Sequence, residues 1–176
     1  MTNHIVIAKY RENTRWAEEF PLVTVIEKGI HLPNKGREPT SYLWYIINRW
    51  DELKGHYVFT QGNPTDHLDP REFHKPFEHF KWYRHEGWTN LRCDMNGRPH
   101  DDLDIKKFLE LIGLPYSGEV LTFNARCIVG VSAERIKSRP KSFYERCYDV
   151  IMNQEPGDKY EYVFERVVGL IWAGEF

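Results

Sequence analysis

The sequence predicts a single α/β domain with a mostly parallel β-sheet and helices packed on it. Short runs of β-branched residues alternate with helical patterns through the first 60 residues, which is typical of βαβ units. The chain has 176 residues, enough for one domain with a sizeable core. Hydrophobic residues make up 41% and charged residues 28%, a balance that indicates a globular chain rather than a disordered one.

The first half of the chain contains three predicted strands, at 5–8, 22–26 and 56–60. A short helix is predicted between the first two, over 14–20, because Pro21 disfavours helix at the residue before it. The clearest helix lies between the second and third strands, over 39–53, with Pro39 in its first turn. Its apolar residues recur at helical spacing, namely Leu43, Ile46, Ile47, Trp50 and Leu53.

The region 68–99 is rich in His, aromatic residues and Pro and shows no regular pattern. Beyond it, the sequence predicts a helix over 101–111, a strand over 127–131 and a short helix over 133–138 with Ser132 as its N-cap. Pro140 opens a longer helix. The last helix, over 160–172, carries an apolar stripe of Val163, Phe164, Val167, Val168 and Ile171.

Charge and cysteine content argue against several functional classes. The formal net charge is −2, whereas a non-specific nucleic-acid binder usually carries a basic excess. The three cysteines, Cys93, Cys127 and Cys147, form no CxxC pair, which argues against a zinc site and a disulfide framework and favours a reducing compartment. No apolar run approaches the length of a membrane span, and the N-terminus lacks a signal-peptide pattern. We therefore expect a cytoplasmic protein.

Three polar segments lie where an open α/β sheet binds ligands, at the carboxyl ends of its strands. Each follows a strand or precedes a helix. They are Lys9, Tyr10, Arg11 and Glu12; Asn34, Lys35, Gly36, Arg37 and Glu38; and Gln61, Gly62 and Asn63 with the residues up to His67.

The second segment is suited to a diphosphate. Gly36 allows a tight backbone, and the next helix offers unpaired N–H groups and the positive end of its dipole. Lys35 and Arg37 add positive charge. The alternative is an ordinary loop in which Arg37 and Glu38 are surface ions.

The third segment offers Asp66 as a metal or sugar ligand and His67 as a ligand or general base. The alternative is a turn at Asn63 in which Asp66 caps the next element. On the last helix, Glu165 is a candidate base and Arg166 a candidate phosphate anchor if their face lines a cleft. A structural ion pair is the alternative for Glu165.

In their order, these motifs resemble a domain-of-unknown-function family with fungal, bacterial and viral members that is related to GT-A glycosyltransferases. The resemblance spans nearly the whole chain and rests on the strings AKYRE, LPNKGRE, YVFTQGNPTDH, VGVSAERI, PKSFYER and VFERVVGLI. It implies a Rossmann-like GT-A fold, a three-layer sandwich whose mostly parallel sheet has helices on both faces.

The resemblance also implies a nucleotide-sugar donor above the sheet. Lys9 to Glu12 would lie near the base and ribose, and Arg37 and Glu38 near the donor. GT-A enzymes usually hold a divalent ion, such as manganese or magnesium, with a DxD motif at a strand end. Here that strand end reads Gln61-Gly62-Asn63, and Asp66 is the candidate metal ligand.

The function expected from this sequence is therefore transfer of a sugar from a nucleotide-sugar donor to an acceptor. The acceptor would be a glycan or a small molecule; the net charge makes a modified DNA base less favoured. Asp66, His67 or Glu165 would deprotonate the acceptor hydroxyl. Two alternatives stay open, namely a non-catalytic nucleotide- or sugar-binding module on the same fold, and a hydrolase of phosphate or glycosidic bonds.

Overall fold

The computed structural model describes residues 3–64, 88–90, 103–114 and 128–172. In these residues five strands form one sheet in the order β2-β1-β3-β5-β4. The strands are β1 (Asn3–Lys9), β2 (Val23–Glu27), β3 (His56–Gln61), β4 (Trp88–Asn90) and β5 (Val129–Ser132). β1 pairs in parallel with both β2 and β3, which confirms the parallel arrangement predicted for the first three strands.

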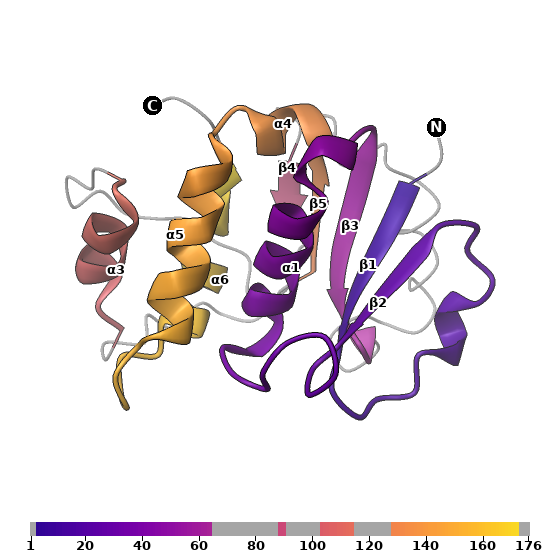
Figure 1. Cartoon of the computed structure of the whole chain (residues 1–176), viewed down its shortest axis with the longest axis horizontal. Helices are drawn as coiled ribbons and strands as arrows, with labels where there is room; N and C mark the ends of the chain where they lie inside the picture. The colour runs from indigo at the N-terminus through magenta and orange to yellow at the C-terminus, as the bar shows by residue number, and fades with distance from the viewer. Residues whose placement is uncertain (1–2, 65–87, 91–102, 115–127, 173–176) are drawn as a thin grey trace.

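The sheet is mixed because β5 runs against both of its neighbours. Ala133 donates its backbone N–H to the carbonyl of Gly55 at 2.8 Å, which ties the end of β5 to the start of β3. β5 therefore ends at the edge of the sheet where β3 begins. The carboxyl ends of β1, β2 and β3 share the opposite edge, at the bottom of Figure 1.

Five α-helices and two 3-10 turns accompany these strands within the described residues. They are η1 (Arg15–Ala17), α1 (Arg37–Asn48), η2 (Trp50–Glu52), α3 (Ile105–Ile112), α4 (Ala133–Lys137), α5 (Lys141–Met152) and α6 (Tyr160–Trp172). α6 has the bounds that its stripe predicts. The helix predicted over 39–53 begins earlier, at Arg37, and ends at Asn48, because Arg49 leaves helical geometry at φ −112° and ψ 15°.

Side-chain caps fix the starts of two helices. Ser132 accepts a 3.0 Å hydrogen bond from the backbone N–H of Arg135, as predicted for α4. Asp104 accepts one of 2.9 Å from the N–H of Lys107. α3 therefore begins at Ile105, later than the position 101 that the sequence suggested, and Asp104 is its N-cap.

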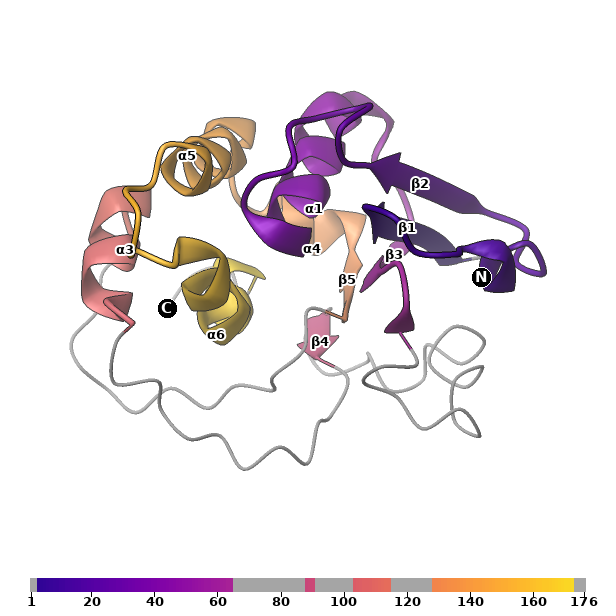
Figure 2. The same ribbon diagram turned by 90° about the horizontal axis from the view of Figure 1, so that it is seen from below.

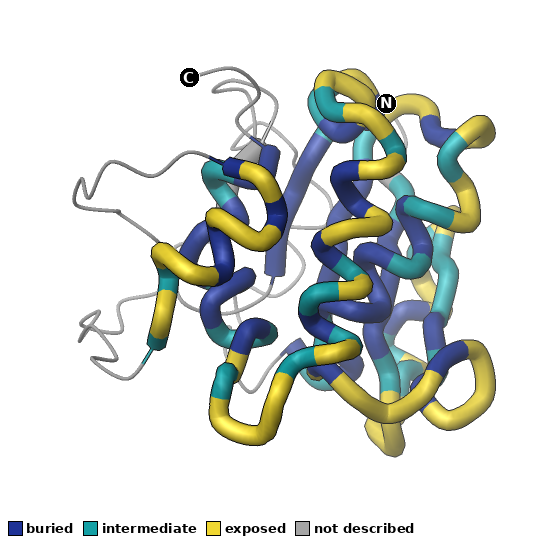
Figure 3. The backbone as a smooth tube through the Cα atoms, turned by 60° about the vertical axis from the view of Figure 1, so that its left-hand side comes forward, coloured by how far each residue is buried: buried dark blue, intermediate teal, exposed yellow. Residues whose placement is uncertain are grey.

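The main core lies between one face of the sheet and the α-helices (Figure 2). Val6, Ala8, Tyr57 and Phe59 point to this side, and residues from all the described α-helices pack against them. Trp172 of α6 stacks on Phe59 with ring centroids 5.9 Å apart. Figure 3 shows the resulting pattern, with buried inner faces of α1 and α5 and exposed outer faces.

The other face of the sheet carries a smaller cluster. Alternation along the strands turns Ile5, Ile7 and Val58 to this side, where Ala17 and Trp16 of η1 cover them. Within the described ranges, the η1 turn and no α-helix covers this face. The sequence analysis expected helices on both faces of the sheet, whereas the described α-helices lie on one face only. None of the helices in these ranges combines the length and the apolar composition that a membrane crossing requires.

Candidate functional site

The carboxyl ends of β1 and β2 are joined by an ion pair. Lys9 and Glu27 are register partners in the parallel ladder. The Lys9 ammonium lies 2.7 Å from a carboxylate oxygen of Glu27, and both side chains are partly exposed. The charge of Lys9, a predicted donor-binding residue, is therefore balanced within the protein.

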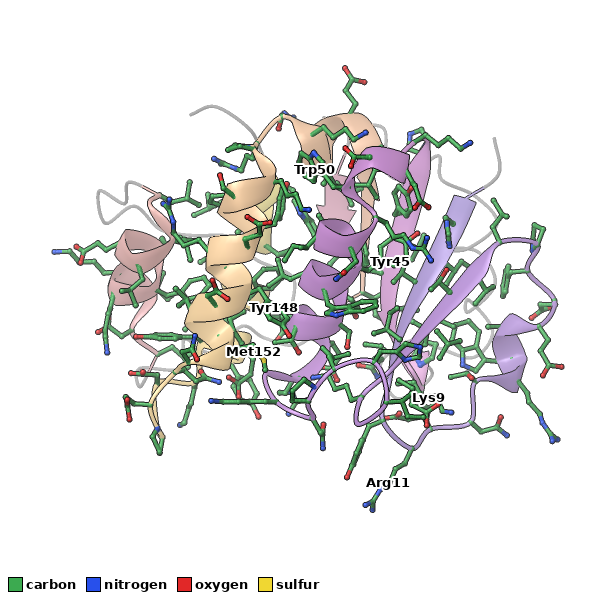
Figure 4. The ribbon with its side chains drawn as sticks, in the orientation of Figure 1. Lys9, Arg11, Tyr45, Trp50, Tyr148 and Met152 are labelled. Carbon is green, nitrogen blue, oxygen red and sulfur yellow. The ribbon has the colours of Figure 1, made fainter. Side chains whose placement is uncertain are left out.

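The loop after β1 is shaped by Glu12. Its carboxylate accepts hydrogen bonds from the backbone N–H groups of Tyr10 at 2.6 Å and Arg11 at 3.0 Å. Burial alone raises the pKa of this carboxyl, but these backbone donors and the charge of Lys9 bring the pKa of Glu12 below its ordinary value. Glu12 thus has a structural role, whereas the side chain of Arg11 extends away from the body of the molecule (Figure 4).

The loops after β1 and β3 are in direct contact. The Trp16 indole donates a 2.8 Å hydrogen bond to the carbonyl of Gly62. A Cβ atom at Gly62 would lie only 2.8 Å from both Cβ and Oε2 of Glu12. Gln61 donates to the carbonyl of Asn63 at 2.7 Å and so closes its own turn. The structure therefore brings two of the three predicted polar segments together.

A buried lysine attaches the second segment, Asn34 to Glu38, to the same edge. Lys28, which directly follows β2, is only 6% exposed. Its ammonium donates to the carbonyls of Lys35 at 2.9 Å and of Arg37, and to the hydroxyl of Thr40 at 2.9 Å. This lysine is the anchor of the loop 34–38, and the sequence analysis did not single it out. The sequence signal for this role was a lysine placed between a predicted strand and Gly29. That pattern is equally typical of an exposed turn, so it does not predict a buried lysine.

The backbone of this loop takes a left-handed conformation at two successive residues. Gly36 has φ +69° and Arg37 has φ +47°, which is uncommon for a residue with a side chain. Glycine is required at position 36 because a Cβ there would meet Cγ2 of Thr40 at 2.3 Å and Cγ2 of Ile151 at 2.6 Å. Asn34 and Lys35 are exposed beside it.

Arg37 is held by the last helix. Its Nη1 donates a 2.8 Å hydrogen bond to the hydroxyl of Tyr162, and its guanidinium carbon lies 4.9 Å from the centroid of that ring. Glu38 accepts from Nε at 3.4 Å. Burial alone lowers the pKa of Arg37, but Glu38 and Tyr162 raise it above its ordinary value, so the side chain stays charged. It is still 53% exposed and accessible to an anion.

Glu165 and Arg166 form an ion pair with each other. Nη1 of Arg166 lies 2.7 Å from a carboxylate oxygen of Glu165, and the side chains are 9% and 16% exposed, respectively. The same nitrogen donates to the carbonyl of Tyr162 at 3.2 Å. This pair is the structural alternative considered for Glu165, and Arg166 faces a carboxylate of the protein itself. Tyr162 therefore contacts both Arg37 and Arg166.

Asp66 and His67, the other predicted catalytic residues, lie outside the described residues. Within the described ranges, no three His, Cys, Asp or Glu side chains are grouped as a metal site would need. The carboxyl edge thus combines Lys9 to Glu12, Asn34 to Glu38 and Gln61 to Asn63, with Lys28 beneath the loop and Tyr162 beside Arg37.

The sequence matches one family over residues 5–176, and that family is described as "Protein of unknown function (DUF3431)". No curated protein and no solved structure matches the chain. The match covers nearly the whole chain, as the resemblance implied. This chain therefore belongs to the family described as a protein of unknown function, DUF3431.

Proposed function

We propose that the chain binds the diphosphate of a nucleotide sugar at the start of α1 and transfers the sugar to an acceptor hydroxyl. The observation that supports this most is the Lys28 anchor. It holds the carbonyls of Lys35 and Arg37. Because a trans peptide is planar, the N–H groups of the following residues, Gly36 and Glu38, point away from that ammonium. Gly36 itself is buried and Glu38 is partly exposed. The positive end of a helix dipole at such a start is suited to an anion.

The charges around this point are consistent with a diphosphate ligand. Arg37 offers a half-exposed guanidinium that stays protonated, and Lys35 adds an exposed ammonium next to it. The loop Lys9 to Glu12 lies at the same edge, where Tyr10 is 40% exposed and could stack on a nucleotide base. In this proposal the finer fold is the Rossmann-like GT-A sandwich.

The chemistry requires stabilisation of the departing diphosphate and removal of a proton from the acceptor. Arg37, Lys35 and the N-terminus of α1 would stabilise the negative charge that builds on the diphosphate in the transition state. Asp66 or His67 would accept the proton from the acceptor hydroxyl. Manganese or magnesium, with Asp66 as its ligand, would supply further positive charge at the diphosphate.

One observation favours a second candidate, a nucleotide- or sugar-binding module without catalysis. Glu165, one of the candidate bases, lies 2.7 Å from Arg166, so its carboxylate is already paired with a cation of the protein itself. Binding and turnover separate the two candidates, because both bind a nucleotide sugar and only the enzyme consumes it.

Calorimetric titration with a panel of nucleotide sugars, with and without manganese, tests the proposal. Arg37→Ala should weaken binding at least about tenfold, since it removes a charge-assisted contact to the ligand. Arg49→Ala is the matched control because Arg49 is also 53% exposed and also pairs with a glutamate, Glu52, but lies at the other end of α1.

The proposal fails if no nucleotide sugar binds, or if Arg37→Ala binds as tightly as the wild type. Circular dichroism on each variant shows whether the fold is intact. Release of free sugar or phosphate in the absence of an acceptor would indicate the hydrolase alternative instead.

A further inference from the structure

A groove lies between α1 and α5 on the solvent side of the helical layer, away from the carboxyl edge of the sheet. It has a volume of about 320 Å³. Each helix contributes three residues at i, i+3 and i+4 spacing, so the two sets form facing stripes. The lining residues are Trp44, Ile47 and Asn48 from α1 and Glu145, Tyr148 and Asp149 from α5.

Both charged residues that line this groove are acidic. Glu145 and Asp149 lie one helical turn apart on α5, and no basic side chain is among the lining residues. Like charges at i, i+4 destabilise a helix by a few tenths of a kcal/mol. Lys141 approaches Glu145 to 3.8 Å, beyond hydrogen-bond range, and both side chains are more than 40% exposed.

The rest of the lining provides two aromatic side chains. Trp44 and Tyr148 are half-buried, on opposite sides of the groove. In Figure 4, Tyr148 lies on the side of α5 that faces α1. Aromatic ring faces attract cations, most strongly where water is partly excluded. Burial raises the pKa of Tyr148, and so does the nearby negative charge of Asp149. The same negative charge favours a positively charged ligand.

We infer that this groove binds a small organic cation, through an alkylammonium or guanidinium group placed between Trp44 and Tyr148 and paired with Glu145 and Asp149. A volume of about 320 Å³ suits such a group with a short aliphatic stem. A neutral sugar would use the rings but gain little from the two charges, and an anion would be repelled. None of these residues belongs to the proposed nucleotide-sugar site, so the inference stands independently of that proposal.

Calorimetric titration of the full chain with agmatine and with cadaverine tests the inference. Agmatine carries one guanidinium and one ammonium group, whereas cadaverine carries two ammonium groups. Saturable binding is expected, and it should weaken as salt is added because both partners are charged. Glu145→Gln keeps the shape of the side chain and should weaken binding about tenfold. Asp149→Asn should act in the same way.

Glu18→Gln is the control of equal charge change. Glu18 is exposed next to η1, on the other face of the sheet, and its substitution should change the affinity less than about twofold. Trp44→Leu removes the aromatic ring but leaves both carboxylates, Glu145 and Asp149, in place. It should still weaken the binding of both cations, because the ring contributes to the site.

Three results would overturn the inference. They are no saturable binding of either cation, equal weakening by Glu145→Gln and Glu18→Gln, and tighter binding of a neutral disaccharide than of the cations. Circular dichroism of each variant separates loss of the groove from loss of the fold.

Discussion

The ammonium of Lys28 and the hydroxyl of Thr40 are hydrogen-bonded at 2.9 Å beneath the first turn of α1. The same hydroxyl lies 2.7 Å from the carbonyl of Lys35, as a donor. Both side chains are buried, at 6% and 0% exposure. The end of β2 and the start of α1 are therefore joined by side chains that also hold the loop between them.

Lys28→Met should destabilise the protein. The methionine keeps the aliphatic stem but removes the donor, which leaves the carbonyls of Lys35 and Arg37 without their charged partner. The hydroxyl of Thr40 can still donate to one of these carbonyls at a time, so we expect the free energy of unfolding to fall by about 1–3 kcal/mol. Urea unfolding measures this loss. Lys54→Met, at an exposed lysine, should change it by less than about 0.5 kcal/mol; equal effects would show that Lys28 is no anchor.

Gly62→Ala should destabilise the contact between the loops after β1 and β3. The new methyl group would lie 2.8 Å from Cβ of Glu12, an atom that cannot move without its backbone. We expect a loss of about 1–3 kcal/mol, as for other overpacked sites. A double-mutant cycle with Glu12→Gly checks the cause, because removing the clashing side chain should recover part of the loss. Purely additive effects would place the strain elsewhere.

The stabilising contribution of the Glu12 carboxylate should be lost in acid. Its pKa is lowered in the folded state, so its contribution is complete above the unfolded value of 4.5 and is lost as the pH falls through the lower folded value. The stability difference between the wild type and Glu12→Gln should therefore shrink below pH 4.5. Unfolding curves measured across that range test this. A difference that stays constant with pH would show that the charge of Glu12 is not involved.

The periodicity of the sequence predicted the elements well where the pattern was strong. α6 has the predicted bounds because five of its residues form one apolar stripe. The start of α1 was missed because it is set by the left-handed Gly36 and by Lys28 from another segment. The antiparallel direction of β5 was also not predictable. Alternation of strands and helices favours parallel pairing and does not indicate which strand is antiparallel.

The candidate site was predictable as a set of loops but not as a set of contacts. The carboxyl-edge rule located Lys9 to Glu12 and Gln61 to Asn63, and the structure brings these segments into contact. Pairing over long sequence separations could not be predicted. Arg37 and Tyr162, which are 125 positions apart, form a hydrogen bond that no local pattern indicates.

Glu165→Gln distinguishes a catalytic base from a structural ion pair. Arg166 is 9% exposed, so loss of the partner's charge would leave a buried guanidinium poorly compensated. We expect the free energy of unfolding to fall by about 2–4 kcal/mol. The double variant Glu165→Gln with Arg166→Met removes both charges and should recover part of this loss, because the cost arises from the uncompensated cation. Urea unfolding of the single and double variants measures both effects. If Glu165→Gln instead keeps its stability and loses turnover of a nucleotide sugar, Glu165 acts in the chemistry and the ion pair is not its main role.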